Sequence, residues 1–92
     1  MTYLLARFKL DDYETWKRDR FDQDPAGRRE VAKSHRIMRN AEDPNEVFVQ
    51  VEFDSADTAR SFRERLKQSG ALEGINVITP PTVVEEADSQ TY

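Results

Sequence analysis

The sequence predicts a small α+β domain in which two helices cover one face of a four-stranded antiparallel sheet. The clearest observation is a hairpin between Lys33 and Phe53, because valine recurs at every second position of residues 47–53, the period of a pleated strand. A helix-like segment lies on each side of this hairpin, and a further strand-like segment lies beyond each helix. The resulting order, β-α-β-β-α-β, is the ferredoxin-like arrangement.

The elements before the hairpin follow from alternation and from capping residues. Residues 2–9 alternate apolar side chains between two faces and predict the first strand. A helix is expected to begin at Asp11 or Asp12, since Asp11 with Glu14 fits a capping box. We expect this helix to break within residues 22–24.

A shorter helical piece is expected after this break. Asp24 fits an N-cap and Pro25 the first helical position, so the piece would extend through about Ala32. The hairpin then has its first strand at residues 34–39 and a turn at residues 40–46, where Pro44 and its neighbours suit turn geometry.

The second main helix is expected to begin at Ser55, a good N-cap. Its apolar stripe has helical spacing and consists of Ala56, Ala59, Phe62 and Leu66. Gly70 suits the C-terminal stop. Residues 71–79 are expected to be a connector, and residues 82–87 the fourth strand.

Both faces of the predicted sheet carry apolar residues. Phe48 points away from the valines of its own strand, and Tyr3 and Leu5 oppose the apolar residues at positions 4 and 6. Val83 and Val84 are adjacent, so one goes to each face. Because the helices cover only one face, the other needs a partner, and the simplest is a second copy related by two-fold symmetry. The sequence therefore predicts a homodimer through the sheet face.

Composition excludes several classes of function. The net charge is −4, and basic residues lie beside acidic ones, whereas a nucleic-acid interface needs a coherent positive surface. Without cysteine there is no disulfide framework, thiolate metal site or cysteine nucleophile. No segment resembles a signal peptide or reaches membrane length, so we expect no membrane partner and a cytoplasmic location. The chain is expected to be one domain, residues 1–87, with a polar tail, residues 88–92.

The order of elements and a few local motifs resemble the dimeric α/β-barrel superfamily. Within it, the chain looks most like the small stand-alone proteins grouped with antibiotic-biosynthesis monooxygenases. The likeness covers about residues 3–87 and rests on Tyr13 with Trp16, on residues 43–46 and 53–55, and on Ala59 with Phe62.

This resemblance implies that two sheets pack face to face into a closed barrel, with a pocket in each subunit between the sheet and the helices. Members include cofactor-independent oxygenases, isomerases, polyketide cyclases and haem-degrading enzymes. The haem-degrading members place a histidine on the second helix, and residues 56–69 contain none. We therefore expect no cofactor, and no catalytic set carries over residue by residue.

The candidate ligand-binding residues are Tyr13, Trp16, Arg20 and His35. Tyr13 and Trp16 suit the wall of a pocket for a flat aromatic ligand, although aromatic residues at helical spacing are more often plain core. Arg20 lies on the same helical arc and suits an anionic or enolate oxygen, unless its head reaches solvent or pairs with Asp24. His35 has a side chain suited to proton transfer, but an ordinary polar residue, half exposed at the start of an edge strand, is the favoured interpretation.

Other residues are weaker candidates for a binding site. Arg28 and Arg29 follow Gly27 and suit a phosphate, while Arg7, Gln50 and Glu52 suit either the inside of a barrel or paired interface charges. No spacing of histidine and acidic residues predicts a metal site.

Two hypotheses about function remain open. The first is a cofactor-independent monooxygenase, isomerase or cyclase that acts on a small molecule, such as an aromatic one. The second is a non-catalytic small-molecule-binding or structural homodimer. An enclosed pocket with at least two convergent polar groups favours the first, and a packed interior without a cavity under the first helix favours the second.

Overall fold

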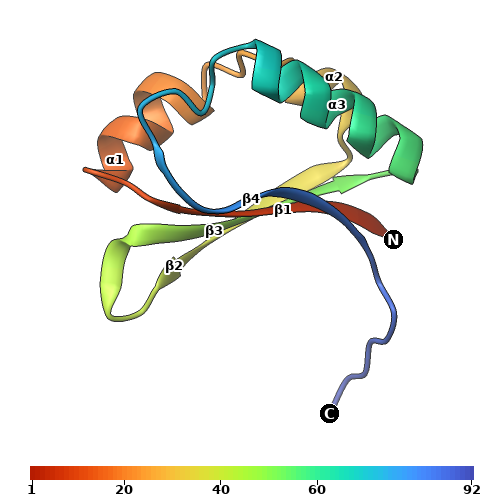
Figure 1. The fold of residues 1–92 in the computed structure, drawn as a ribbon. Helices are drawn as coiled ribbons and strands as arrows, with labels where there is room; N and C mark the ends of the chain where they lie inside the picture. The colour runs from red at the N-terminus through yellow and green to blue at the C-terminus, as the bar shows by residue number, and fades with distance from the viewer.

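The computed structural model describes all 92 residues as a four-stranded antiparallel sheet with helices on one face (Figure 1). In chain order the elements are β1 (Thr2–Lys9), α1 (Tyr13–Trp16), the π-helix η1 (Lys17–Phe21), α2 (Arg28–Val31), β2 (Ser34–Asn40), β3 (Asp43–Phe53), α3 (Ala56–Gln68) and β4 (Asn76–Glu85). The strand order is β2-β3-β1-β4. The predicted α+β class and antiparallel sheet are confirmed, and the arrangement is consistent with a ferredoxin-like fold.

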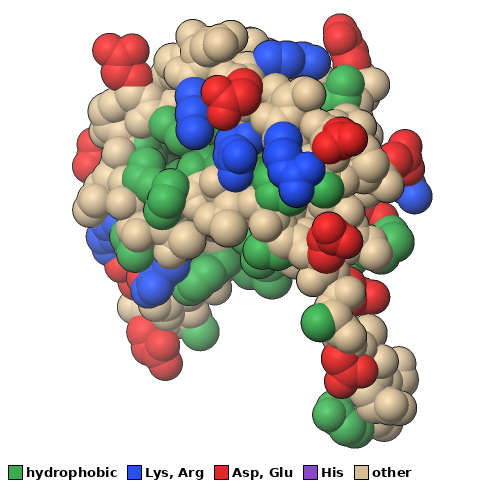
Figure 2. All heavy atoms as spheres, turned by 45° about the vertical axis from the view of Figure 1, so that its right-hand side comes forward, with side chains coloured by type: hydrophobic (Ala, Val, Ile, Leu, Met, Phe, Trp, Pro, Cys, Tyr) green, Lys and Arg blue, Asp and Glu red, His purple; other side chains and the backbone are tan.

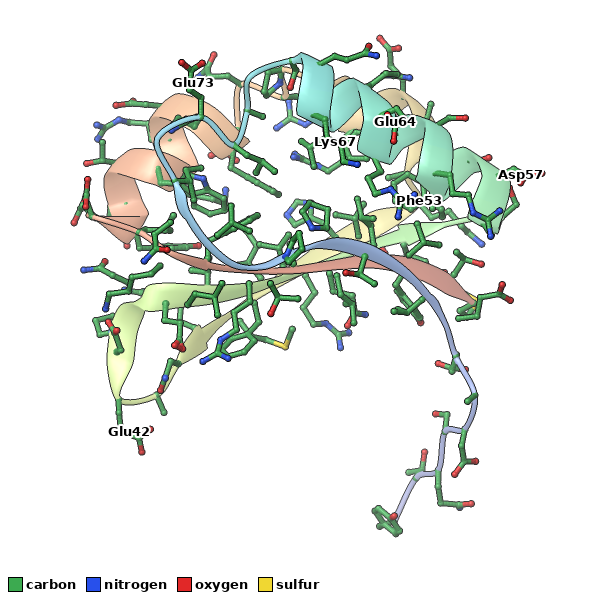
Figure 3. All side chains as sticks on the ribbon, viewed as in Figure 1. Glu42, Phe53, Asp57, Glu64, Lys67 and Glu73 are labelled. Carbon is green, nitrogen blue, oxygen red and sulfur yellow. The ribbon has the colours of Figure 1, made fainter.

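The hydrophobic core lies between the sheet and the helical layer. The central strands β1 and β3 pair with Leu4 opposite Val51 and Phe8 opposite Val47, so alternate residues of both strands point to the helices. Phe53 lies beneath α3 (Figure 3), while Lys67 of α3 is exposed. The ring centroids of Phe53 and Phe62 are 5.4 Å apart. The apolar stripe predicted for α3 therefore faces the sheet.

The hairpin turn is shorter than predicted. Only Ala41 and Glu42 lie between the two strands, and residues 43–46, expected in the turn, belong to β3. Glu46 pairs with Lys9 of β1, and the Asn45 side chain accepts a hydrogen bond from the backbone N of Tyr13 at 2.9 Å. These contacts with β1 and α1 keep the segment extended despite its turn-forming residues.

The fourth strand begins six residues earlier than predicted, at Asn76, and includes Pro80 and Pro81. Prolines are tolerated because β4 is an edge strand, where a missing N–H interrupts fewer ladder bonds. The register with β1 shifts on both sides of Arg7, which indicates bulges. The proline pair therefore lies within the strand and does not delimit it.

The first helical region also differs from the prediction. Asp12, not Asp11, is the N-cap, and its carboxylate accepts hydrogen bonds from the backbone N and Oγ1 of Thr15 at 2.9 and 2.7 Å. The helix then continues as η1, whose wider turn ends where the Asp22 N–H bonds the Lys17 carbonyl at 2.9 Å. A helical wheel drawn at 100° per residue therefore misplaces side chains beyond position 16.

The short helix α2 starts later than predicted, after Gly27 and not at Pro25. Gly27, and not Asp24, is therefore the N-cap, although the Asp24 carboxylate accepts hydrogen bonds from the backbone N atoms of Arg28 and Arg29 at 2.7 and 3.1 Å. Asp24 has a φ of 54°, which is uncommon outside glycine, although aspartate tolerates it better than most residues.

The ends of α3 agree with the prediction. Ser55 accepts a hydrogen bond from the backbone N of Thr58 at 3.2 Å, and Gly70 has a φ of +74° just beyond the helix, as a C-terminal stop requires. Residues beyond Glu85 form no helix or strand and extend away from the body (Figure 1). None of the helices combines the length and the apolar character that crossing a membrane requires.

Candidate functional site

A cavity of about 70 Å³ lies between the sheet and the helical layer, and most of the residues that line it are hydrophobic. Its floor consists of core-facing residues of β1 and β3, namely Leu4, Ala6, Phe8, Val49 and Val51. Its roof and walls include Trp16, Phe21, Ala26, Phe62, Leu66 and Leu72. Three residues of the irregular segment between η1 and α2 also line it, namely Asp24, Pro25 and Ala26.

Three charged residues also line this cavity: Arg20, Asp24 and Arg28. Arg20 Nη2 donates to the backbone oxygens of Ala71 and Gly70 at 2.8 and 3.3 Å. Arg20 thus fastens η1 to the connector between α3 and β4. Both carboxylate oxygens of Asp24 accept the α2 backbone hydrogen bonds described above. Two of the three charged groups are therefore committed to holding the cavity walls.

Arg28 is different, because it is buried without a full set of partners. The residue is 6% exposed, and its guanidinium lies over the Phe21 ring, 3.9 Å from the centroid. Nη1 is 3.4 Å from the Phe21 carbonyl oxygen and 3.8 Å from Asp24 Oδ1, whereas the buried Nη2 has no hydrogen-bond partner. Burial lowers the pKa of Arg28, and Asp24 partly opposes this effect.

An aromatic cluster surrounds Phe21 at the edge of the cavity. The Phe21 ring centroid is 5.1 Å from that of Trp16 and 5.0 Å from that of His35, with the His35 ring edge-on. Partial burial and then the positive charge of Arg28 lower the pKa of His35. The cluster therefore joins a cavity wall to the edge strand β2, and partial burial there disfavours the charged form of the imidazole.

Two of the four predicted ligand-binding residues, Trp16 and Arg20, line the cavity. Tyr13 and His35 are not among the lining residues. The Tyr13 ring lies 6.0 Å from Trp16 and carries the guanidinium of Arg39 4.3 Å from its centroid. His35 is an exposed residue of β2 that reaches the site only through Phe21. The alternative ion pair of Arg20 with Asp24 is not present among the salt bridges of the structure.

The sequence indicates a functional role for Arg28 only weakly. The only signal was the run of Gly27, Arg28 and Arg29, which suggested a phosphate contact from a loop. In the structure the two arginines diverge, since Arg28 is buried and Arg29 is exposed. Which of two adjacent arginines turns inward depends on the φ of Gly27, +73°, and on Asp24, and no periodicity encodes either.

The opposite face of the sheet is uncovered and carries an open hollow of about 440 Å³. Leu5, Met38 and Phe48 line it and are 37%, 42% and 37% exposed. Hydrophobic side chains are visible on the lower side of the molecule, away from the helices (Figure 2). Arg7, also at this hollow, lies 5.0 Å from the Phe48 ring centroid and bonds the Glu46 carboxylate at 2.8 and 3.0 Å.

Chemically, the cavity offers an apolar surface with one incompletely paired cation. No group of three or more histidine and acidic side chains lies close enough to hold a metal ion. Asp24 is the only carboxylate among the cavity residues, and its oxygens already accept backbone hydrogen bonds. The arrangement is suited to holding a small apolar molecule and a negatively charged oxygen.

Comparison with known protein families finds no matching family, and no curated protein shows significant sequence similarity to the chain.

Proposed function

We propose that this chain is a homodimeric small-molecule-binding protein, built as a ferredoxin-like dimeric α/β barrel, whose ligand occupies the cavity between the sheet and the helices. The observation that carries the proposal is the cavity itself. Protein interiors are packed with few voids larger than a water molecule, and apolar cavities of sufficient size bind apolar ligands. A cavity of about 70 Å³ in a domain with only 15 buried residues is a large part of the interior to leave unfilled.

The volume limits the ligand. An engineered apolar cavity of about 150 Å³ holds benzene, so 70 Å³ encloses an apolar group of roughly three carbons by the same proportion. An aromatic ligand would lie partly outside, or displace residues 22–27 between η1 and α2. A small aliphatic ligand fits the enclosed part best.

The dimer proposal rests on the uncovered sheet face. Leu5, Met38 and Phe48 expose apolar surface there, and the charge of Arg7 is already paired with Glu46 within the subunit. A second copy would therefore bury apolar surface, and the charge of Arg7 would remain paired with Glu46 inside the interface. A buried charge is tolerated when it is paired. We expect the interface to bury about 1,200–2,000 Å² in total.

The site favours binding over catalysis. A cofactor-independent oxygenase, isomerase or cyclase needs a general base, and the only carboxylate of the cavity, Asp24, is occupied by the N–H groups of Arg28 and Arg29. His35 does not line the cavity. Catalysis is the second candidate, and its support is Arg28, since a guanidinium stabilises a developing enolate oxygen.

The test is a ligand screen on matched variants. Wild-type protein is screened by ligand-detected NMR against small aliphatic and aromatic acids, amides and alcohols. Ala71→Leu adds a bulky side chain at a half-buried cavity residue. Ala41→Leu makes the same change in the exposed hairpin turn and is the control.

We expect the wild type and Ala41→Leu to bind the same compounds and Ala71→Leu to lose them while still folding. Binding that survives in folded Ala71→Leu would place the ligand elsewhere, and the absence of any ligand would remove the proposed function. Sedimentation velocity tests the dimer separately, and a monomer at micromolar concentration would contradict it.

A further inference from the structure

We propose that the cavity selects small carboxylic acids and that the Arg28 guanidinium is the group that binds the carboxylate. This inference rests on the proposed function and adds the ligand class and the residue that recognises it. It assigns the anion contact to Arg28 and not to Arg20, the arginine that the sequence pattern favours.

The argument begins with the cost of burying Arg28. A guanidinium has five N–H donors in a fixed fork and keeps its charge in proteins, and burying a charge is unfavourable unless it is paired and hydrogen-bonded. Here the residue is 6% exposed, its closest carboxylate oxygen is 3.8 Å away on Asp24, and Nη2 has no partner. The buried charge of Arg28 therefore has too few hydrogen-bond acceptors within the subunit, and a further acceptor would complete its hydrogen bonding.

The position of Arg28 beside the cavity indicates from which side a further hydrogen-bond acceptor can approach it. The structure has three buried side-chain nitrogen atoms without a partner, on Arg7, Arg28 and Arg63, and of these residues only Arg28 lines the apolar cavity. Asp24 cannot supply the missing bond without giving up its backbone contacts with α2. The cavity is therefore the place from which an acceptor can reach this guanidinium.

The stacking contact with Phe21 holds the guanidinium beside the cavity. The Cζ atom of Arg28 lies 3.9 Å from the centroid of the Phe21 ring. Nη2 is closed off from solvent in this conformation, so carboxylate binding requires a change in the Arg28 side-chain torsions that brings the fork to the cavity. The two N–H groups of the fork then match the two oxygens of a carboxylate.

The lining and the volume of the cavity limit the part of the ligand that lies beyond its carboxylate. Its walls are hydrophobic at 12 of 17 residues, so the part of the acid beyond the carboxylate must be apolar. A volume of about 70 Å³ encloses roughly three carbons, which matches the isopropyl group of isobutyrate. Isobutyrate and its neutral amide, isobutyramide, have nearly the same size and shape and differ in charge, so they form a matched pair of probes.

The experiment measures both probes on the dimeric wild type through the fluorescence of Trp16. Trp16 is the only tryptophan and lines the cavity. Arg28→Met removes the guanidinium and keeps an apolar side chain. Arg29→Met makes the same charge change at the adjacent exposed residue, and Arg20→Met does so at the other arginine of the cavity.

We expect isobutyrate to bind at least about tenfold more tightly than isobutyramide, as a charge-assisted bond to a buried guanidinium implies. The preference should vanish in Arg28→Met and persist in Arg29→Met and in any folded Arg20→Met. If Arg28→Met does not fold, Arg28→Lys keeps the charge without the fork and should reduce the preference severalfold.

Equal binding of acid and amide by the wild type would overturn the assignment of Arg28 and leave the proposed binding function standing. An acid preference that is unchanged in Arg28→Met would overturn it in the same way. Failure of both probes, together with an empty ligand screen, would instead remove the proposed function and this inference with it.

Discussion

Replacement of Trp16 by alanine tests whether the residue is the packing anchor of the first helical region. Trp16 is 8% exposed, and its ring lies 6.5 Å from Phe8, 6.0 Å from Tyr13 and 5.1 Å from Phe21 between centroids. It therefore joins α1 and η1 to the sheet. One side of the same ring faces the cavity, where it has no packing partner.

The magnitude follows from these contacts. A buried aromatic side chain removes about 150–250 Å² from water, which at about 25 cal/mol per Å² gives roughly 4–6 kcal/mol as an upper estimate. Aromatic-to-alanine changes in cores cost about 3–5 kcal/mol. Because the side of Trp16 that faces the cavity contributes no dispersion contacts, we expect about 3 kcal/mol for Trp16→Ala. A domain of this length has a free energy of unfolding of about 5–14 kcal/mol, so the loss is large.

The assay is urea unfolding followed by circular dichroism at one fixed protomer concentration, because the proposed dimer would make stability depend on concentration. Tyr92→Ala is the control, since Tyr92 is fully exposed in the tail and should change stability by less than about 0.5 kcal/mol. A thermal melt should show Trp16→Ala at least about 12 °C below wild type. A Trp16→Ala variant within about 1 kcal/mol of wild type would refute the account of Trp16 as an anchor.

Three further predictions concern the dimer, a helix cap and pH. Phe48→Glu places a charge on the uncovered sheet face and should give monomers in sedimentation velocity, whereas Ala41→Glu in the turn should not; a dimeric Phe48→Glu would contradict the proposed interface. Asp12→Ala removes the acceptor for Thr15 and should cost about 1 kcal/mol in urea unfolding; an unchanged midpoint would argue against the cap. Partial burial and then the positive charge of Arg28 lower the pKa of His35, so the unfolded chain binds more protons as pH falls below about 6.5, and stability decreases there. His35→Gln should flatten that part of the stability curve, and an NMR titration of His35 with a midpoint above about 6.5 would contradict the sign.

Sequence patterns predicted the elements that are amphipathic over several turns or residues. The valines of β3 and the stripe of α3 bury one face each, so their periods follow from packing against the core. Ser55 and Gly70 were located correctly because a cap and a left-handed stop depend on one residue and its nearest neighbours. Periodicity and capping residues are therefore sufficient to predict regular strands and helices whose conformation depends on neighbouring residues.

The errors occur where contacts between distant segments decide the conformation. Residues 43–46 have the composition of a turn, but the Asn45 side chain accepts a hydrogen bond from the backbone N of Tyr13 in the first helix, a contact between distant parts of the chain. Pro80 and Pro81 read as a stop, but β4 lies at the sheet edge, where proline is tolerated.

The candidate site shows the same limit. Trp16 and Arg20 were expected near a pocket and line the cavity, but a helical wheel cannot represent the π-helix that sets the direction of Arg20. The burial of Arg28 depends on a left-handed glycine at Gly27 and on the carboxylate of Asp24. Neither feature has a period, so the sequence alone gave Arg28 only weak support.

The central claim, that a small ligand occupies the cavity between the sheet and the helices, is tested most directly by intermolecular NOEs from isobutyrate methyl protons. The account predicts NOEs to ring protons of Trp16, Phe21 and Phe62, which line this cavity. NOEs confined to Phe48 and Met38, on the uncovered sheet face, would contradict it.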